Sequence, residues 1–344
     1  TNYATALTDA NLTAGKSYRP TTPLFPAVQR ILARTGPHPF TGHEWAVKEN
    51  ENEILNDLRF SLPFSGDSFL VGLFGAFALL SVTSVQEGIT GHYTHTIRPS
   101  DPIAASGTRQ TKVTSMYFEA TGPDAGRRKR KFQSLALERF TLNIRRRELI
   151  QLESAWVGSG QEDAAAAVTL PALSAEQLLS GTQVKVEVMN QGAGSTDLTA
   201  RFREATLEFQ QVLQADQGYI PNATTPASGK FRSDLRFLRR LVNMTLAFEV
   251  DRSSTDLEDR VKNRTRTEVK ISVDNGVVAG TGTKNHGFVF RVPDCRLMEA
   301  PLDFPEEEAV YGVSIPGEHM YPDAGIGNKP FELVVENTQV SYLV

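Results

Sequence analysis

The chain contains a single cysteine, Cys295, among its 344 residues. A disulfide within the chain is therefore impossible, and zinc sites built from several cysteine thiolates are excluded. A lone thiol agrees with a reducing compartment, and we expect Cys295 to act as a small buried hydrophobic residue.

Long hydrophobic runs are also missing. The longest apolar segment, 69–80, is shorter than the ~20 residues that a helix needs to cross a bilayer. Residues 1–9 have neither the basic nor the apolar region of a signal peptide. We therefore expect a protein that is made in the cytoplasm, is not exported by the usual route and has no membrane partner.

The chain has no excess of positive charge. Lys and Arg number 36 against 40 Asp and Glu, so the formal net charge is −4. This balance does not favour general binding to polyanions. The hydrophobic fraction of 40% is enough for ordinary cores, and the charged fraction of 22% does not indicate wholesale disorder.

The apolar segment 69–80 predicts a short buried helix. Ser65 or Asp67 can cap the first turn of this helix. Gly72 and Gly75 lie on neighbouring turns, where they would let another segment pack closely against the helix backbone.

Most of the remaining chain alternates between apolar and polar residues, which is typical of β-strands. Short helices are predicted at 27–34 and 175–179, and a hairpin turn at 274–276. The regular strand–helix–strand order of Rossmann and TIM folds is missing, so the fold class is mainly β, a sandwich or barrel with short helices. The predicted strands are 53–64, 91–99, 111–118, 132–144, 149–157, 183–189, 199–213, 241–250, 265–274, 286–292, 308–314 and 331–343.

Composition divides the chain into three parts. Residues 1–43 are rich in Thr, Pro, Gly and Ala and predict an extended N-terminal arm. An Ala-rich patch at 161–168 marks the best boundary between a first β-rich lobe, 44–165, and a second one, 166–344. Two tube-like lobes in tandem are slightly favoured over one elaborated lobe, although no repeat is visible at the level of residues.

Motifs for catalysis or cofactors are weak. His92 and His95 have a metal-pair spacing, but residues three apart on a strand point to opposite faces, so a structural role is expected. The segment 280–285 is glycine-rich like a phosphate loop, yet it lacks a third glycine and a following helix and predicts a hairpin loop. Common hydrolase and nucleotide motifs do not occur. We expect no enzymatic activity, no catalytic residues, no cofactor and no metal.

The sharpest charge run is Arg127, Arg128, Lys129, Arg130 and Lys131. It follows a glycine-rich turn, and no aromatic residues for base stacking are interleaved with it. This pattern favours a solvated loop or a subunit contact over a nucleic-acid contact. We therefore name these five residues as a candidate subunit-contact loop.

Over about 44–344, the order of these elements resembles the tail tube proteins of long-tailed bacteriophages (siphophages). In that family a similar strand and buried helix precede a Tyr-Thr-His-Thr strand, here Tyr93–Thr96, and the tube-forming sheet follows. The other matching segments are Glu53–Ala78, Val113–Phe118, Phe132–Ile144, Glu204–Phe209, Leu241–Glu249, His286–Pro293 and Phe331–Val344.

The resemblance implies a structural virion protein, the major tail tube subunit. Copies would form closed rings, trimeric or hexameric, that stack into the tail tube after assembly in the cytoplasm of the host bacterium. Viral DNA would pass through the bore during ejection without specific binding, and other tail proteins would bind the ends of the tube. The long arm, the Arg-rich run and the Ala-rich patch depart from the family pattern.

Two other function classes remain open. A β-sandwich module that binds a receptor or carbohydrate would need an exposed aromatic patch, for which Trp45, Trp156, Tyr311 and Tyr321 are the candidates. A β-rich hydrolase would need two carboxylates that converge in a cleft, and their spacing cannot be read along the chain.

Overall fold

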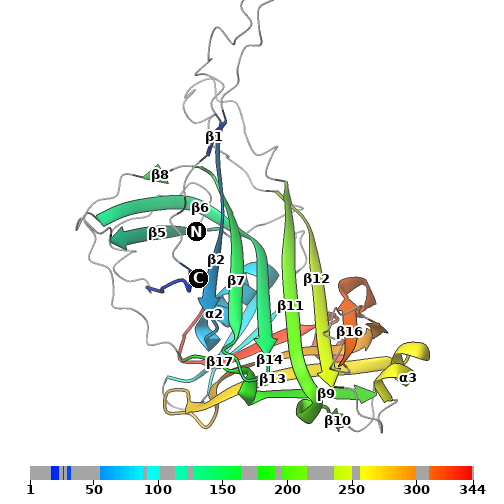
Figure 1. The fold of residues 1–344 in the computed structure, drawn as a ribbon. Coiled ribbons are helices and arrows are strands. Elements are labelled where there is room, and N and C mark those ends of the chain that lie inside the picture. Colours follow the sequence, from blue (N-terminus) through cyan, green and yellow to red (C-terminus); the bar gives the residue numbers. More distant parts are fainter. Residues whose placement is uncertain are drawn as a thin grey trace, which may run out of the picture.

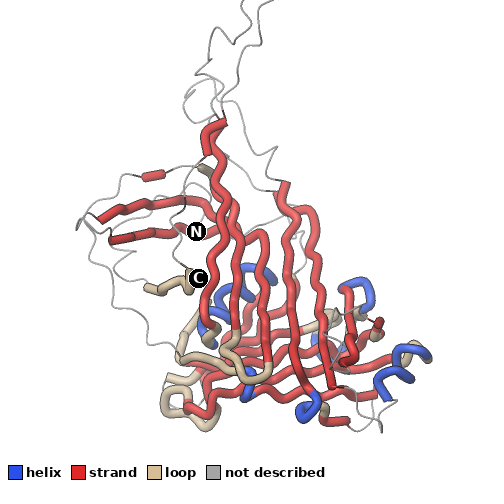
Figure 2. Tube along the Cα trace, viewed as in Figure 1, coloured by secondary structure: helices blue, strands red, loops and turns tan. Residues whose placement is uncertain are grey.

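The computed structural model describes residues 17–22, 26, 29–31, 55–87, 91–100, 113–121, 127–160, 162–163, 177–190, 195–214, 236–249, 256–299 and 310–342. Within these residues the protein forms two antiparallel β-sheets that share a hydrophobic core (Figures 1 and 2). The mainly β class with few short helices is confirmed. Figure 1 shows the strands of one sheet running across those of the other.

The larger sheet has ten strands, and β5 and β8 pair with the N-terminal half of β6. Its inner face is apolar and its outer face polar because side chains alternate along each strand. In sheet order the strands are β1 (Gln29–Ile31), β2 (Leu55–Ser65), β7 (Gln151–Gly158), β6 (Arg127–Arg145), β11 (Phe202–Gln214), β12 (Arg236–Glu249), β16 (Val310–Pro316) and β15 (Met298–Glu299), with β5 (Val113–Thr121) and β8 (Glu162–Asp163) beside them.

The smaller sheet has seven strands, and every neighbouring pair in it is antiparallel. Its two edges are therefore β10 and β3. In sheet order the strands are β10 (Ser195–Asp197), β9 (Val184–Asn190), β13 (Arg266–Val278), β14 (Asn285–Arg296), β17 (Glu332–Asn337), β4 (Tyr93–Pro99) and β3 (Leu80–Gln86).

Each sheet combines strands from both sides of residue 165, where the sequence placed a boundary between two lobes. The larger sheet joins β2, β7 and β6 to β11, β12 and β16, and the smaller one joins β3 and β4 to five strands from after residue 165. The segments 44–165 and 166–344 are thus interleaved within the described residues and contribute to one core.

Helix α2 (Ser68–Leu79) is the predicted apolar helix, and Asp67 caps it. The Asp67 carboxylate accepts a hydrogen bond of 2.6 Å from the backbone N–H of Leu70. Ten of its twelve residues are buried because the helix packs between the sheets, against β6 and β11 on one side and β4, β14 and β17 on the other.

Strand β6 is bent in the middle. Its first half pairs with β5 and its second half with β7 and β11. The bend lies at Ser134, which is buried and has a left-handed φ of 53°, next to a register shift against β5. Figure 1 shows β6 curving away from the rest of the sheet toward β5.

Two predicted helices are wrong where the structure describes them. Gln29–Ile31, within the predicted helix 27–34, is a strand because it adds to the edge of β2. Residues 177–180 are extended rather than helical, and Leu178 and Ser180 form isolated bridges to Asp67 and Leu149. The other described helices are α3 (Asp256–Lys262) and the 3-10 turns η2 (Gly181–Gln183), η3 (Thr199–Arg201), η5 (Gly317–His319) and η6 (Ala324–Ile326).

The predicted turn at Asp274–Gly276 is wrong, since these residues remain in β13 and form a bulge against β14. The bulge is stabilised by a 2.7 Å hydrogen bond from the backbone N–H of Gly276, at φ +72°, to Asp274 Oδ1. The chain reverses later, at 280–284, as the glycine-rich hairpin prediction requires. None of the helices in the described part of the chain has the length and apolar character that a membrane crossing requires.

Candidate assembly surface

Strand β3 is an open edge of the smaller sheet. It pairs with β4 along all seven residues, and no strand of the described residues pairs with its other side. Its sequence, Leu-Ser-Val-Thr-Ser-Val-Gln, carries no charge and no proline, and its register has no bulge. Natural edge strands usually carry a charged residue, a proline or a bulge, and each of these prevents pairing with another chain. The side chains from Thr83 onward are exposed, and Val85 is 54% exposed.

Helix α2 holds this edge strand in place without an intervening loop. Leu80 is both the helix C-cap and the first residue of β3, with a left-handed φ of 68° and its N–H donating to the Ala76 carbonyl. A left-handed conformation is strained for a residue with a Cβ atom. The buried Leu79 beside it anchors the junction in the core, so β3 is displayed from a fixed point.

A charged cluster closes the far end of β3. It consists of Glu87, His92, Thr94, Lys284 and Glu336, from the β3–β4 connection, β4, the β13–β14 hairpin and β17. Lys284 Nζ lies 2.6 Å from Glu87 Oε1 and 3.0 Å from Glu336 Oε1. The buried His92 donates from Nε2 to Glu336 Oε2 at 2.8 Å. The hydrogen bond from Lys284 lowers the pKa of Glu87. These contacts tie the ends of the β3–β4 and β13–β14 hairpins to β17.

His95 fixes the middle of β3 from the core side. Its Nε2 donates to Asn337 Oδ1 at 3.2 Å, so its Nδ1 accepts from the Ser84 hydroxyl at 2.8 Å. Burial lowers the pKa of His95 and of His286, whose Nδ1 lies 3.3 Å from Ser68 Oγ. His92 and His95 thus have separate hydrogen-bond partners, and His92 precedes β4 rather than lying on the same strand as His95. Among the described residues no group of three His, Cys, Asp or Glu side chains is placed to hold a metal ion.

The outer face of the larger sheet is a second candidate surface, here called the polar face. Strand register aligns its side chains in rows across β2, β7, β6, β11, β12 and β16. One such row holds only uncharged polar residues, while the row one residue away on each strand faces the core and is entirely apolar. The polar row is Ser65, Gln151, Asn143, Thr206, Thr245 and Ser314, and the apolar row is Phe64, Leu152, Leu142, Leu207, Met244 and Ile315.

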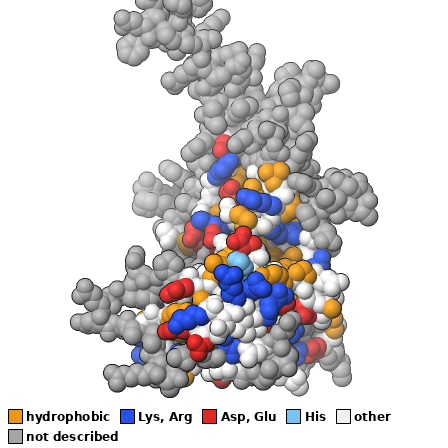
Figure 3. Space-filling model, turned by 90° about the vertical axis from the view of Figure 1, so that its right-hand side faces the viewer, with side chains coloured by type: hydrophobic (Ala, Val, Ile, Leu, Met, Phe, Trp, Pro, Cys, Tyr) orange, Lys and Arg blue, Asp and Glu red, His pale blue; other side chains and the backbone are white. Residues whose placement is uncertain are grey.

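Charges on the polar face are largely compensated. Arg139 lies 3.7 Å from Glu153, and Arg145 lies 3.4 Å from Glu204. Glu208 is in no ion pair among the described residues. The face therefore combines neutral hydrogen-bonding groups with arginines that lie near carboxylates, and one exposed arginine of β12, Arg239, is in no ion pair among the described residues. The side shown in Figure 3 also intersperses positive, negative and hydrophobic side chains.

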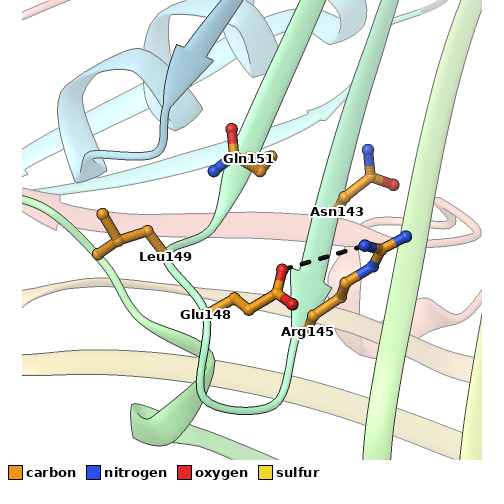
Figure 4. Close-up of a pocket in the computed structure, with 5 residues that line it drawn as sticks. All are labelled: Asn143, Arg145, Glu148, Leu149 and Gln151. Carbon is orange, nitrogen blue, oxygen red and sulfur yellow. Dashed lines mark ion pairs between the residues drawn. The ribbon is translucent and has the colours of Figure 1, made fainter. Parts of the chain in front are cut away.

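A small open pocket lies on the polar face at the β6–β7 turn (Figure 4). Its volume is about 210 Å³, and Asn143, Arg145, Glu148, Leu149 and Gln151 line it. Arg145 and Glu148 point toward each other across the turn, with Nη1 and Oε2 4.0 Å apart. Since both side chains are more than half exposed, the pair is solvated and weak.

The predicted contact loop Arg127–Lys131 is not a loop. All five residues lie in β6, where they pair with Thr121–Tyr117 of β5, so the prediction of a turn is wrong. The reason is that these residues pair with β5 and so continue the strand. Lys131 is only 7% exposed, and Arg130 Nη1 donates to the Pro26 carbonyl at 2.9 Å. A role for this segment in subunit contact stays a prediction.

Two of the four aromatic candidates for a binding patch already pack against other residues of the protein. Trp156 is 1% exposed and packs against Phe74 and Phe77 in the core. Tyr321 lies under the guanidinium of Arg266, 3.7 Å from the ring centroid. Trp45 lies outside the described residues, and Tyr311 is half-buried.

Cys295 is fully buried, as predicted, and its thiol donates to the Thr267 carbonyl at 3.1 Å. Sequence reasoning missed the open edge β3 because residues 80–86 read only as a polar connection after the helix. Its β-branched, uncharged composition was the available signal.

No protein-family model matches this chain, and no curated protein sequence matches it. The resemblance to tail tube proteins therefore stays a prediction.

Proposed function

We propose that this chain is a self-assembling structural subunit, the tail tube protein of a long-tailed phage. The observation that carries the proposal is the open edge β3, seven residues without charge, proline or bulge. In an isolated monomer such an edge is an aggregation hazard, whereas in a ring it becomes the contact between subunits. Closed rings that stack form the tube.

The polar face suits the wall of a conduit for DNA. Tight binding to DNA requires unpaired Lys and Arg that replace counterions on the phosphates. Arg139 and Arg145 already lie near carboxylates, and the neutral row between them offers hydrogen bonds without net charge. DNA in contact with this face would therefore pass along it without tight binding. Catalysis forms no part of this function.

A receptor- or carbohydrate-binding module is the weaker alternative. Such a module needs exposed aromatic rings for its ligand, whereas Trp156 lies in the core and Tyr321 is covered by Arg266.

The test is electron microscopy and sedimentation of the purified chain at increasing concentration. Rings or hollow fibres are expected for the wild type. Val85→Lys places a charge on the open edge and should leave isolated subunits with an unchanged unfolding midpoint, since Val85 is 54% exposed. Val277→Lys is the matched control, because Val277 is 47% exposed and lies within β13, away from the edge, so it should assemble.

Wild-type protein that stays monomeric under conditions that favour polymerisation contradicts the proposal. So does a Val85→Lys variant that assembles as well as the Val277→Lys control.

A further inference from the structure

Three consecutive residues of β13, Asn275, Gly276 and Val277, have no paired residue on either neighbouring strand. In the register with β14 they are skipped by the bulge, and the pairing with β9 ends before them. Gly276 and Val277 are exposed, and a Cβ atom on Gly276 would meet no heavy atom within 4 Å. The backbone of this segment is therefore open to water and is not held by the hydrogen-bond ladder of the sheet.

Hydrogen bonds polarise two groups of this segment that can react with each other. The Gly276 N–H donates to Asp274 Oδ1 at 2.7 Å, and Asn275 Oδ1 accepts from the Val277 N–H at 2.9 Å. Asp274 is held from the next strand, since Asn285 Nδ2 donates to its Oδ2 at 3.1 Å. A carboxylate thus lies against the Gly276 nitrogen, and an N–H donor lies against the carbonyl oxygen of the Asn275 amide.

We propose that Asn275 is a site of spontaneous deamidation that the fold promotes. The Gly276 nitrogen forms a bond to Asn275 Cγ and closes a five-membered succinimide ring. The proton of the Gly276 N–H passes to the Asp274 carboxylate, which returns it to the side-chain nitrogen as that nitrogen leaves as ammonia. Water then opens the ring at either carbonyl and leaves aspartate or isoaspartate at position 275.

Each neighbour has a defined role in this reaction. Asp274 is the general base for the attacking nitrogen. The Val277 N–H stabilises the negative charge that develops on Asn275 Oδ1, as a donor in an oxyanion hole does. Asn285 acts only through Asp274 and is a positioning residue. Gly276 has a φ of +72° and open space around it, so its backbone nitrogen is not hindered by a side chain.

Other asparagines of the chain lack this arrangement. Asn275 is followed by glycine, and this is the only Asn-Gly pair in the sequence. Asn143 and Asn243 lie in the larger sheet with paired strands on both sides, and they are followed by Ile144 and Met244. These two residues therefore serve as internal controls.

Peptide mass spectrometry of the purified chain, after incubation at neutral pH, tests the proposal. The peptide with residue 275 should gain the mass of deamidation and contain both aspartate and isoaspartate, while the peptides with Asn143 and Asn243 stay unchanged. The native chain should react about a hundredfold faster than the same chain unfolded in urea, because only the fold holds Asp274 and Val277 against the reacting groups.

Asp274→Asn should remove this advantage, so that the native variant reacts as slowly as the unfolded chain. Asp197→Asn is the matched control, because Asp197 is an exposed carboxylate of the same sheet whose Oδ1 also accepts a backbone N–H two residues on, at 2.9 Å; it should react at the wild-type rate. Urea unfolding shows whether each variant folds, and the comparison of native with unfolded wild type needs no variant.

The proposal is wrong if native wild type reacts no faster than the unfolded chain, or if folded Asp274→Asn reacts as fast as wild type. Three strands separate β13 from the open edge β3, and the reaction needs no second copy. Its outcome is therefore independent of whether the chain assembles.

Discussion

Substitution of Gly72 by Ala should destabilise the protein, although alanine is the better helix former. Gly72 lies on α2 where the ring of Tyr342 packs over the helix backbone, and a Cβ there would come within 2.6 Å of Tyr342 Cε2. Tyr342 is 9% exposed, contacts the rings of Phe69 and His95, and accepts a hydrogen bond from Asn337. The new methyl group would therefore force Tyr342 out of its site.

The expected change in the free energy of unfolding on Gly72→Ala is the sum of two opposing contributions. Loss of a buried large aromatic side chain costs about 3–5 kcal/mol, and replacing glycine by alanine within a helix returns about 1 kcal/mol. Gly72→Ala should thus lower the free energy of unfolding by about 2–4 kcal/mol. In a Tyr342→Ala background the clash is absent, so the same substitution should raise it by about 1 kcal/mol.

Urea unfolding followed by circular dichroism measures all four proteins of this double-mutant cycle, and equal m-values show that the comparison is valid. The diagnostic result is that Gly72→Ala lowers the free energy of unfolding in the otherwise wild-type chain and raises it in the Tyr342→Ala background. If Gly72→Ala is neutral or stabilising in the otherwise wild-type chain, the packing of the C-terminal segment over α2 is refuted.

Three further predictions concern the core and its titratable groups. Phe74→Asp, which buries an unpaired charge at a 3% exposed position between the sheets, should cost several kcal/mol and leave no cooperative unfolding transition; a native-like transition would contradict it. Burial lowers the pKa of His95 and His286, so below about pH 6.5 the unfolded chain takes up more protons than the folded one. Stability should be complete above that pH and fall as the pH drops below it, and urea midpoints that rise on acidification would show the opposite linkage. Burial raises the pKa of Cys295 to about 12, so a thiol reagent should label it only after unfolding; rapid labelling of the native protein would argue against a buried site.

Local signals predicted the elements that depend on neighbours in sequence. The helix predicted at 69–80 is found at Ser68–Leu79, and Asp67 was one of two predicted caps. Gly72 and Gly75 admit Tyr342 and Leu333 close to the helix, as their spacing suggested, although the sequence did not identify those partners.

Local signals failed where a distant strand decided the outcome. Gln29–Ile31 lies in a helix-like pattern but is a strand, because the edge of β2 satisfies its backbone hydrogen bonds. The basic run Arg127–Lys131 reads as a turn but continues β6, because β5 pairs with its whole length.

The sequence by itself determined the mainly β class, the buried helix and the lack of disulfides, because alternation, capping and composition are properties of neighbouring residues. Tertiary structure alone decided that the two halves of the chain interleave in both sheets and that β3 is left as an edge. Strand order and register depend on pairings between residues as far apart in sequence as Tyr93 and Asn337, and no short-range pattern records which strand lies next to which.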